Sequence, residues 1–254
     1  MPEVSSRVHA MSRDTTHLST ERERLAAVAQ QHQPLDLDRD LLDRYAGELA
    51  AWFRGDSCLD VGSRGGCQTE HVVRHFPTVV AIDAVEEHLV ELRRRFPQIR
   101  TAVSLIEEYE TEERFDCAIM IGFLEHVIDP VGVLRKCRSL LKPGGRVMIG
   151  VPNARSLHRH IGVAMGMLPR CDALTENDDK IGHRRVYSWD TLRTDIVAAG
   201  LTVRHMWGGF LKPLSSGQMA RQFTPEQIDA FYEVGRQFPD LCNFILAVAE
   251  HPDT

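Results

Sequence analysis

The sequence lacks the features that mark several specialised classes of protein. It has six cysteines but no Cys-x-x-Cys pair and no spacing typical of a zinc site. Lys and Arg number 30 against 36 Asp and Glu, so the net charge of −6 provides no broad basic surface for a nucleic-acid backbone. No apolar run approaches the roughly 20 residues of a membrane span. We therefore expect a cytoplasmic protein with reduced cysteines, and neither a nucleic acid nor a membrane as its partner.

The length and composition suit one globular domain. A chain of 254 residues, with 43% hydrophobic and 26% charged residues, can bury a substantial core. Residues 1–18 contain no apolar signal segment, and we expect them to form a flexible leader. We expect residues 19–254 to form a single domain, as a monomer or a homodimer.

Predicted strands and helices alternate along most of the chain. Residues 19–54 have the spacing of amphipathic helices, and a short apolar segment, Ser57–Val61, then ends on a glycine-rich turn. Further strands are predicted at residues 78–82, 99–103, 115–121, 146–151, 201–207 and 243–249. Helices are predicted at residues 67–75, 85–95, 130–141, 188–199 and 225–237. This alternation predicts a doubly wound α/β fold, in which helices cover both faces of a mostly parallel sheet.

Two segments interrupt the alternation. Residues 152–187 contain two prolines, polar clusters and no strand pattern, and residues 208–223 are also irregular. We expect both segments, together with the helices of residues 19–54, to form a lid over the side of the sheet where a substrate would bind. Several apolar side chains in or beside these regions are candidates to line a pocket for a small organic molecule, and we expect the majority of them to be core residues. The candidates are Tyr45, Met165, Met167, Trp207, Phe210, Met219 and Phe223.

The segment Leu59–Gly66 places a glycine-rich turn directly after the first predicted strand. Glycines in such a turn allow a ligand to approach the backbone, and the next helix begins with free N–H groups. The dinucleotide pattern Gly-x-Gly-x-x-Gly would need glycine where the chain has Arg64 and Cys67. Asp60, two residues before Gly62, suits a positively charged ammonium group better than a pyrophosphate. The turn therefore favours a ligand with a zwitterionic amino-acid part.

A second acidic residue, Asp83, ends the next predicted strand, 21 residues after Gly62. At this position in doubly wound folds, a carboxylate accepts hydrogen bonds from both hydroxyls of a ribose. A strand-end Asp taken alone is also typical of a helix cap. A ribose and an amino acid without a diphosphate describe S-adenosylmethionine, so the two acidic residues in this order predict that cofactor.

Residues 56–150 resemble the class I, Rossmann-like S-adenosylmethionine-dependent methyltransferases. Four segments carry the resemblance: LDVGSRGG, VVAIDA, FDCAIMIGFLEHVIDP and LLKPGGRVMIGVPN. The chain is most similar to the group of ubiquinone-biosynthesis O-methyltransferases and natural-product methyltransferases, and a looser match continues through GHRRVYSWDTLRTDIVAAGL. The resemblance implies a seven-stranded sheet of order 3-2-1-4-5-7-6, in which strand 7 is antiparallel.

The resemblance also implies which residues hold S-adenosylmethionine and its product, S-adenosyl-L-homocysteine. The implied contacts are Asp60, Gly62, Ser63 and Gly66 for the methionine part, Asp83 and Ala84 for the ribose, Leu105 and Ile106 for the adenine, and Ile121 at the end of the fourth strand. The family pattern Asp-x-Gly-x-Gly-x-Gly has glycine where this chain has Arg64. We expect Gly65 and Gly66 to keep the turn open in spite of this departure.

Methyl transfer to a hydroxyl or an amine releases a proton, so a nearby base is useful. Two histidines are best placed as catalytic residues: His126, which follows the fourth predicted strand, and His183, in the first of the two irregular segments. Both are also compatible with structural roles, because Glu125 and His126 can fasten their loop and His183 can pack beneath the insertion. His158 and His160 are expected at the surface.

Glu125, His126 and His183 also have the residue types of a metal site. Ubiquinone-pathway and small-RNA 2′-O-methyltransferases carry the pattern Glu-x-x-Glu-His here, but this chain has Gly122 in place of the first Glu. The missing oxygen ligand disfavours a divalent cation, which prefers several hard oxygen ligands. We therefore expect no bound metal.

These patterns predict an enzyme that methylates a small molecule, at a hydroxyl oxygen in the first place and at nitrogen in the second. One alternative is an RNA methyltransferase, suggested by the Leu-Glu-His-Val segment but disfavoured by the acidic charge. Another is a regulatory protein that binds S-adenosylmethionine without catalysis. Arg64 suggests this second alternative, and the presence of both Asp60 and Asp83 disfavours it.

Overall fold

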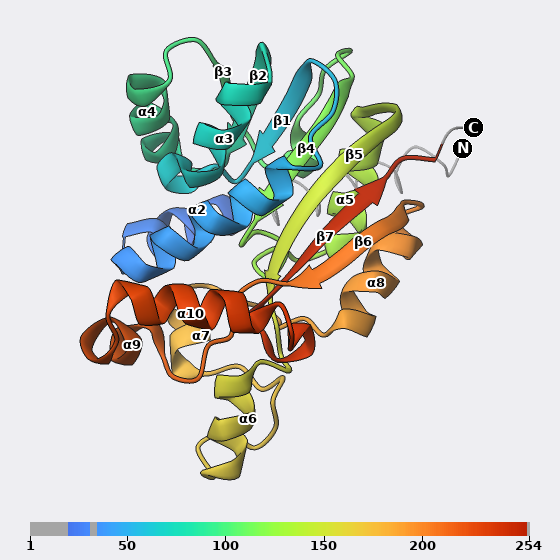
Figure 1. Cartoon of the computed structure of the whole chain (residues 1–254). Coiled ribbons are helices and arrows are strands. Elements are labelled where there is room, and N and C mark those ends of the chain that lie inside the picture. Colours follow the sequence, from blue (N-terminus) through green and yellow to red (C-terminus); the bar gives the residue numbers. More distant parts are fainter. Residues whose placement is uncertain (1–19, 31–34, 253–254) are drawn as a thin grey trace, which may run out of the picture.

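Seven strands form one sheet in the order β3-β2-β1-β4-β5-β7-β6 (Figure 1). The structure is a computed structural model that describes residues 20–30 and 35–252, so the predicted leader of residues 1–18 lies outside the described residues. The strands are β1 (Ser57–Val61), β2 (Thr78–Asp83), β3 (Arg100–Val103), β4 (Phe115–Ile121), β5 (Leu141–Pro152), β6 (Thr202–Gly208) and β7 (Phe244–Glu250). β7 runs antiparallel to β5 and β6, and the other paired strands are parallel. The predicted order and the antiparallel seventh strand are confirmed.

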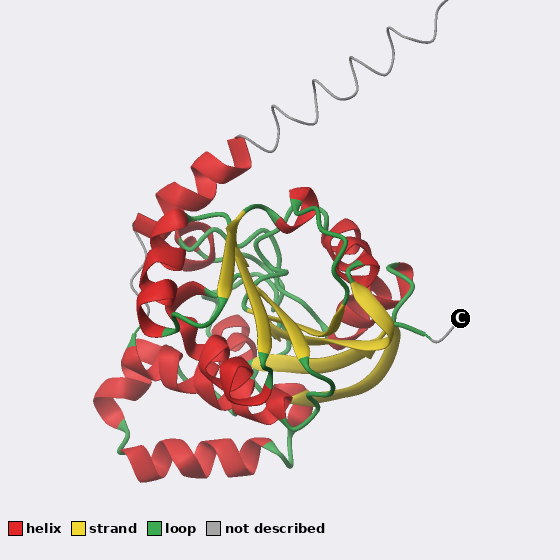
Figure 2. Ribbon diagram, turned by 90° about the horizontal axis from the view of Figure 1, so that it is seen from above, coloured by secondary structure: helices red, strands yellow, loops and turns green. Residues whose placement is uncertain are grey.

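Helices cover both faces of this sheet (Figure 2). One face packs against α2 (Asp36–Ala50), α3 (Cys67–His75), α4 (Glu86–Arg95) and α10 (Pro225–Gly235), and the other against α5 (Pro130–Ser139) and α8 (Trp189–Ala198). Residues 20–30 are also helical. α8 begins where the sequence predicts, because the side chain of Ser188 accepts a hydrogen bond from the backbone N–H of Thr191.

The strand β4 shows why a mostly apolar segment forms the centre of the sheet. Cys117, Ile119 and Ile121 belong to the core on one face, whereas Ala118 and Met120 belong to the core on the other. Successive side chains of a strand point to opposite faces, so a strand covered on both sides must be apolar at every position. The sequence therefore predicts the bounds of β4 correctly.

The insertions lie beyond the carboxyl ends of the parallel strands (Figure 1). Beyond Pro152, where β5 ends, the first insertion contains α6 (Leu157–Ala164) and α7 (Glu176–Lys180) and no further strand, as predicted. Residues 208–223 are less irregular than the sequence suggests, because they contain α9 (Ser216–Gln222). A capping box between Ser215 and Gln218 begins this helix, a local signal that favours a helix even in a short segment.

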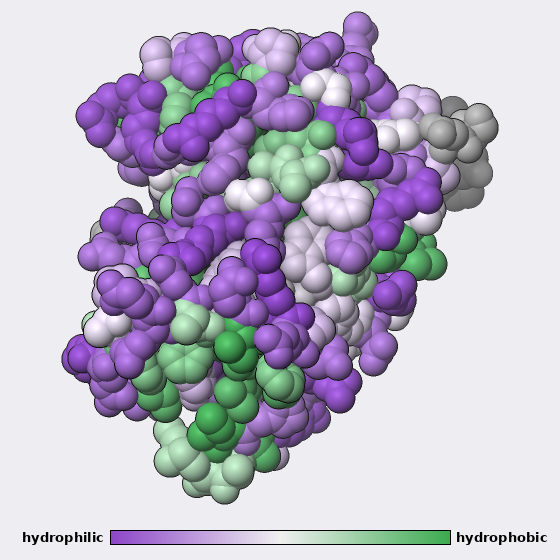
Figure 3. All heavy atoms as spheres, viewed as in Figure 1, coloured by the Kyte–Doolittle hydropathy of each residue, from purple (hydrophilic) through white to green (hydrophobic). Residues whose placement is uncertain are grey.

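The tip of the first insertion is apolar at its surface. Met165 and Met167 are 68% and 72% exposed, and Figure 3 shows apolar atoms at the α6 end of the molecule. In the described part of the chain, none of the helices combines the length and the apolar character needed to cross a membrane.

Candidate active site

Gly62 forms the sharp turn that follows β1, and its geometry excludes other residues. Its φ is +68°, and a Cβ atom there would lie 2.5 Å from Cδ2 of Phe123. The backbone N–H of Gly62 donates to the carbonyl of Ile82 at 2.9 Å, which ties the turn to β2. The next residue, Ser63, is buried, and its Oγ has no hydrogen-bond partner among the described residues. Buried hydroxyls normally have partners, so this atom fits a polar ligand at the turn.

Asp60 lies behind this turn. It is fully buried, and its carboxylate accepts hydrogen bonds from the side chains of Gln68 and Thr69 at the start of α3. Burial raises the pKa of Asp60 to about 6, although the two hydrogen bonds act in the opposite direction. Gln68 also accepts from the backbone N–H of Ile121 at 3.1 Å. Asp60 therefore joins the turn, α3 and the end of β4 into one unit, in addition to its predicted contact with a ligand.

Asp83 ends β2 at the same edge of the sheet. One carboxylate oxygen accepts from the backbone N–H of Val85 at 2.9 Å, and the other lies 3.2 Å from Nδ1 of His88. The carboxylate thus fixes the turn into α4, the alternative role of a strand-end Asp. Each oxygen keeps a further lone pair, so this role leaves room for hydrogen bonds from ribose hydroxyls.

Arg64 occupies the position of a family glycine without strain, because its φ is negative. Gly65 and Gly66, both with a φ of +72°, supply the left-handed conformations that the turn needs. Burial lowers the pKa of Arg64, while the charge of Asp83 acts in the opposite direction. The Arg64 side chain is therefore close enough to Asp83 for the two charges to interact.

Apolar side chains complete this edge. The predicted contacts Leu105, Ile106 and Ile121 are buried at the ends of β3 and β4, and Ala84 is partly exposed beside Asp83. Phe123, which the sequence does not single out, packs its ring against Gly62. The available signal was an aromatic residue directly after Gly122, at the end of the strand nearest to the turn.

Glu125 and His126, which follow β4, meet His183 from a distant segment of the chain. One candidate ligand atom of each lies within 4.8 Å of those of the others. Oε1 of Glu125 is 3.9 Å from Nε2 of His183, and Oε2 has no hydrogen-bond partner in the described part of the chain. Burial raises the pKa of Glu125 to about 7. The cluster therefore places a carboxyl that titrates near neutral pH beside an imidazole nitrogen.

His183 is oriented by Asp178 of α7, which the sequence does not single out. Its Nδ1 lies 3.1 Å from Oδ1 of Asp178, and Oδ2 accepts from Arg159 at 2.7 Å and from the backbone of Thr175 at 2.9 Å. Burial alone would raise the pKa of Asp178, but the hydrogen bonds from His183 and Thr175 and the charge of Arg159 hold it well below its usual range. An ionised Asp178 favours the proton on Nδ1 and leaves Nε2 of His183 as the acceptor.

His126 has a different environment. Its Nδ1 lies 3.2 Å from the carbonyl of Gly182, and its ring centroid is 4.8 Å from that of His183. Burial, together with the charge of His183, lowers the pKa of His126 to about 3. An imidazole with so low a pKa is a weak base, so the geometry favours His183 of the two predicted histidines.

Three arginines fasten the loop that carries Glu125. The carbonyl of His126 accepts hydrogen bonds from Arg24 at 3.0 Å and from Arg184 at 3.1 Å. Arg185 donates to three further carbonyls within residues 124–128. The N-terminal helix and the insertion therefore position this loop together.

Several of the apolar candidates for the acceptor pocket are core residues. Tyr45, Phe210 and Met219 are fully buried in the core beneath α2 and α10, which agrees with the expectation that the majority of the candidates are core. The ring of Tyr45 lies in the core because it packs directly on Gly209, which has no side chain to keep it away. Phe223 also packs against this core.

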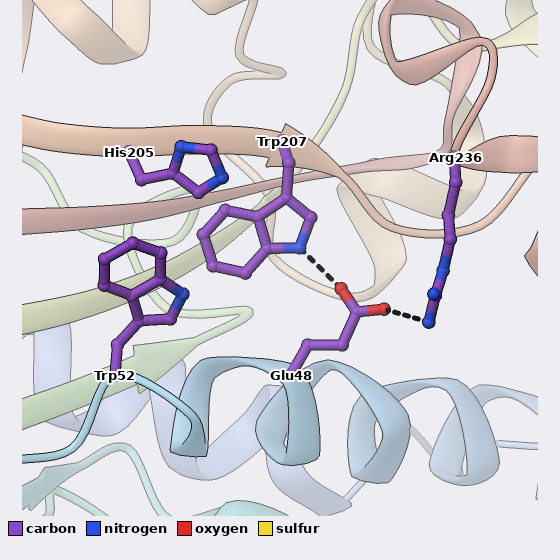
Figure 4. Close-up of a pocket in the computed structure, with 5 residues that line it drawn as sticks. All are labelled: Glu48, Trp52, His205, Trp207 and Arg236. Carbon is purple, nitrogen blue, oxygen red and sulfur yellow. Dashed lines mark hydrogen bonds and ion pairs between the residues drawn. The ribbon is translucent and has the colours of Figure 1, made fainter.

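Trp207 lies in a different pocket (Figure 4). This pocket of about 310 Å³ is lined by Glu48, Trp52, His205, Trp207 and Arg236. The indole N–H of Trp207 donates to Glu48, and its ring centroid is 6.3 Å from that of Trp52. The carbonyl of Trp52 accepts from Arg146 at the amino-terminal half of β5, so this pocket opens at the flank of the sheet rather than at its carboxyl edge.

The expectation that His158 lies at the surface is wrong, whereas His160 is exposed. Nδ1 of His158 is buried and has no hydrogen-bond partner among the described residues. The structural reason is that His158 lies on the side of α6 that faces Lys212. The carbonyl of Lys212 accepts a hydrogen bond from the backbone N–H of His158 at 3.0 Å.

Comparison with known proteins agrees with this architecture. A family model described as a methyltransferase domain matches residues 25–206. The ubiquinone biosynthesis O-methyltransferase of Acinetobacter baumannii (strain AYE) is 28% identical over 215 residues, which cover 80% of this chain and 84% of that protein. The enzyme of the same name from Vibrio parahaemolyticus is 31% identical over 140 residues, covering 53% of this chain and 59% of the relative.

Solved structures share the fold at lower identity. The 1,6-didemethyltoxoflavin-N1-methyltransferase of Burkholderia thailandensis, with bound 1,6-didemethyltoxoflavin and S-adenosylhomocysteine, is 20% identical, with a TM-score of 0.62 over 93% of this chain and 90% of that one. An S-adenosylmethionine-dependent methyltransferase from Mesorhizobium loti is 19% identical, with a TM-score of 0.62 over 82% and 99% of the chains. Because the family model covers more than half of the chain and the strand order agrees with these structures, this chain belongs to the methyltransferase domain family and is an S-adenosylmethionine-dependent enzyme.

Proposed function

We propose that the enzyme methylates a hydroxyl oxygen of a small molecule, with nitrogen as the second possibility. The observation that carries the proposal is the His183–Asp178 pair beside Glu125. A hydroxyl or an ammonium acceptor must lose its proton, and this pair offers a proton acceptor. The names of the curated relatives favour oxygen, while the Burkholderia enzyme acts on nitrogen.

The predicted cofactor residues fit S-adenosylmethionine. The turn at Gly62 and the unpartnered hydroxyl of Ser63 suit the methionine part, Asp83 suits the ribose, and Leu105 and Ile106 suit the adenine. When bound, the cofactor supplies a methyl group that its sulfonium already makes electrophilic. The residues of the chain therefore need to orient the acceptor, exclude water and remove one proton.

We assign the proton acceptor to Nε2 of His183. Asp178 holds the ring and its Nδ1 proton, and Glu125 lies 3.9 Å from Nε2, where its carboxyl can hold the acceptor hydroxyl. His126 supports the ring of His183 by an edge contact. In this arrangement the acceptor oxygen is placed by Glu125 and deprotonated by His183.

Two measurements test the proposal against its alternatives. Calorimetric titration with S-adenosylmethionine should give saturable binding, and no binding would contradict an enzymatic role. Transfer of radiolabelled methyl groups should then label small hydroxylated compounds from a cell extract. Label that appears only in the RNA fraction would support the RNA methyltransferase instead.

Asp83→Ala should weaken the binding of S-adenosylmethionine by about 1–3 kcal/mol, because two ribose hydroxyls lose a charged acceptor. Asp83→Asn keeps the shape of the turn at Val85 and should show a smaller loss. Glu87→Ala, at an exposed position of α4, is the matched control. An unchanged Kd in a folded Asp83→Ala protein would remove the ribose assignment.

Dialysis against a metal chelator should leave kcat unchanged, because Gly122 supplies no ligand where the related pattern has a carboxylate. The measurement compares chelator-treated enzyme with and without added Mg²⁺, Mn²⁺ or Zn²⁺. Activity that is lost on dialysis and restored by one of these ions would show that Glu125, His126 and His183 form a metal site.

A further inference from the structure

His88 on α4 contacts the carboxylate that we assign to the ribose. Its Nδ1 lies 3.2 Å from Oδ2 of Asp83, and the two side chains are only 19% and 9% exposed. The backbone N–H of His88 donates to the carbonyl of Val85 at 3.2 Å, in the first turn of the helix that follows β2. The pair therefore lies at the edge of the sheet where we propose that the cofactor binds.

The hydrogen bond between these two side chains has one direction. An ionised carboxylate has only acceptor atoms, so the proton between the two groups is on Nδ1 of His88. The other oxygen of Asp83, Oδ1, accepts from the backbone N–H of Val85 at 2.9 Å. Each oxygen thus has one donor from the chain, which fixes the plane of the carboxylate and leaves a second lone pair on each oxygen available.

The backbone of this strand end is held as well. The carbonyl of Asp83 accepts from the N–H of Ser104 at 3.0 Å, and the carbonyl of Ile82 accepts from Gly62 at 2.9 Å. With the main chain held from both sides, the side chain of Asp83 is the part that can still rotate. The donor at Oδ1 is a backbone group, which any residue except proline supplies. The donor at Oδ2 belongs to a side chain, so it depends on which residue follows Asp83 five positions later.

The stability of α4 does not account for a histidine at this position. His88 is the third residue of the helix, where a positive charge is unfavourable because the N-terminus of a helix is itself positive. Histidine also has a lower helix propensity than leucine or glutamine. The contact with Asp83 is therefore better explained by what the carboxylate binds than by the helix.

A fixed carboxylate suits a ligand with two neighbouring hydroxyls. The two hydroxyls of a ribose can donate to one carboxylate when both of its oxygens face them. A carboxylate that the chain already holds in this orientation loses little rotational freedom on binding, so more of the interaction energy appears as affinity. The residue that orients the carboxylate should therefore affect the affinity for the cofactor without touching the reacting atoms.

We propose that His88 is a positioning residue for the cofactor, which holds the Asp83 carboxylate through Nδ1 in the orientation that accepts the ribose hydroxyls. This inference rests on the proposed function, which assigns Asp83 to the ribose. His88 acts through Asp83 and takes no part in methyl transfer.

Two replacements of equal size isolate the donor of His88. His88→Asn carries an amide N–H at about the place of Nδ1, whereas His88→Leu has nearly the same shape as His88→Asn and no donor. Calorimetry on the full chain measures the Kd of two probes, S-adenosylhomocysteine and its 2′,3′-dideoxy analogue. The analogue keeps the adenine and the amino acid but has neither hydroxyl. Glu87→Ala, exposed beside His88, is the matched control.

His88→Leu should weaken the binding of S-adenosylhomocysteine by about three- to tenfold, because the ligand must then order the carboxylate itself. The Kd of the dideoxy analogue should be the same in His88→Leu and in the parent. His88→Asn should bind S-adenosylhomocysteine as the parent does. The proposal is overturned by an equal loss for both probes in His88→Leu, by no loss for either, or by a loss in His88→Asn as large as that in His88→Leu.

The same measurements separate this inference from its foundation. If the parent binds both probes equally tightly, Asp83 does not hold the ribose and the proposed cofactor assignment fails. If the parent prefers the probe with hydroxyls and His88→Leu keeps the whole preference, only the role of His88 is wrong. Thermal unfolding checks that the variants are folded. Should His88→Leu not fold, His88→Asp takes its place, since it has the shape of His88→Asn without a donor and should show the same selective loss.

Discussion

His183→Ala should lower kcat by about 10²–10⁴-fold, with little change in the Kd of S-adenosylmethionine. The reason is that Nε2 of His183 takes the acceptor proton, while the cofactor residues lie on other segments. Initial rates at saturating acceptor measure the loss, and calorimetry measures the cofactor affinity. His160→Ala is the matched control, because this histidine is exposed on the same insertion.

The pH dependence of the parent should have a defined direction. His183 becomes positively charged when it takes the acceptor proton, and an ionised Glu125, 3.9 Å away, stabilises that charge. Because burial raises the pKa of Glu125 to about 7, kcat should rise as the pH increases through this value. His126→Ala should reduce kcat less than His183→Ala does, since burial makes His126 a weak base. If both alanine variants keep the parental kcat, the enzyme works by positioning alone and the catalytic assignment is wrong.

Glu125→Gln should raise the free energy of unfolding by about 3 kcal/mol at pH 8.5 while it lowers activity. Burial raises the pKa of Glu125 from 4.5 to about 7, and each unit of pKa corresponds to about 1.4 kcal/mol. The folded parent holds this proton more tightly than the unfolded chain does. The stability of the folded parent therefore falls as the pH rises from about 4.5 to about 7. Above that range the full free-energy cost of the buried, ionised carboxylate is present.

Urea unfolding at pH 4.5 and pH 8.5 tests this expectation. The two proteins should have similar stability at the acidic pH, and the variant should be the more stable one at the basic pH. Asp60, whose pKa burial also raises, titrates in both proteins and cancels in the comparison. Glu87→Gln, at an exposed position, should change neither value. A Glu125→Gln protein that is less stable than the parent at pH 8.5 would mean that the ionised carboxylate is satisfied in the fold.

The cofactor edge was largely predictable because its signals are local. A strand, a glycine turn and a strand-end Asp are each read from neighbouring residues, and parallel strands necessarily bring their carboxyl ends to one edge. Gly62 and Asp83 therefore lie where the sequence predicts. Phe123 was not predicted, since its contact with Gly62 depends on how β4 lies beside β1.

The acceptor side was less predictable because its groups meet only after folding. His183 was identified from its surroundings in the sequence, but Asp178, which orients it, lies on a five-residue helix that no periodicity indicates. The burial of His158 and of Tyr45 could not be predicted from the sequence for the same reason. Their spacing is compatible with both exposure and burial, and the packing of the insertion and of Gly209 decides between them.

The sequence by itself determined the sheet and, through the family resemblance, its order, and it predicted the edge of the sheet at which we propose that the cofactor binds. These properties depend on apolar periodicity and on turn residues that act within a few positions of the chain. Only the tertiary structure brought His183, Asp178 and Glu125 together and gave His126 a different environment from that of His183. The charge states of Glu125 and His126 depend on burial and on neighbours from distant segments, and no local pattern encodes either.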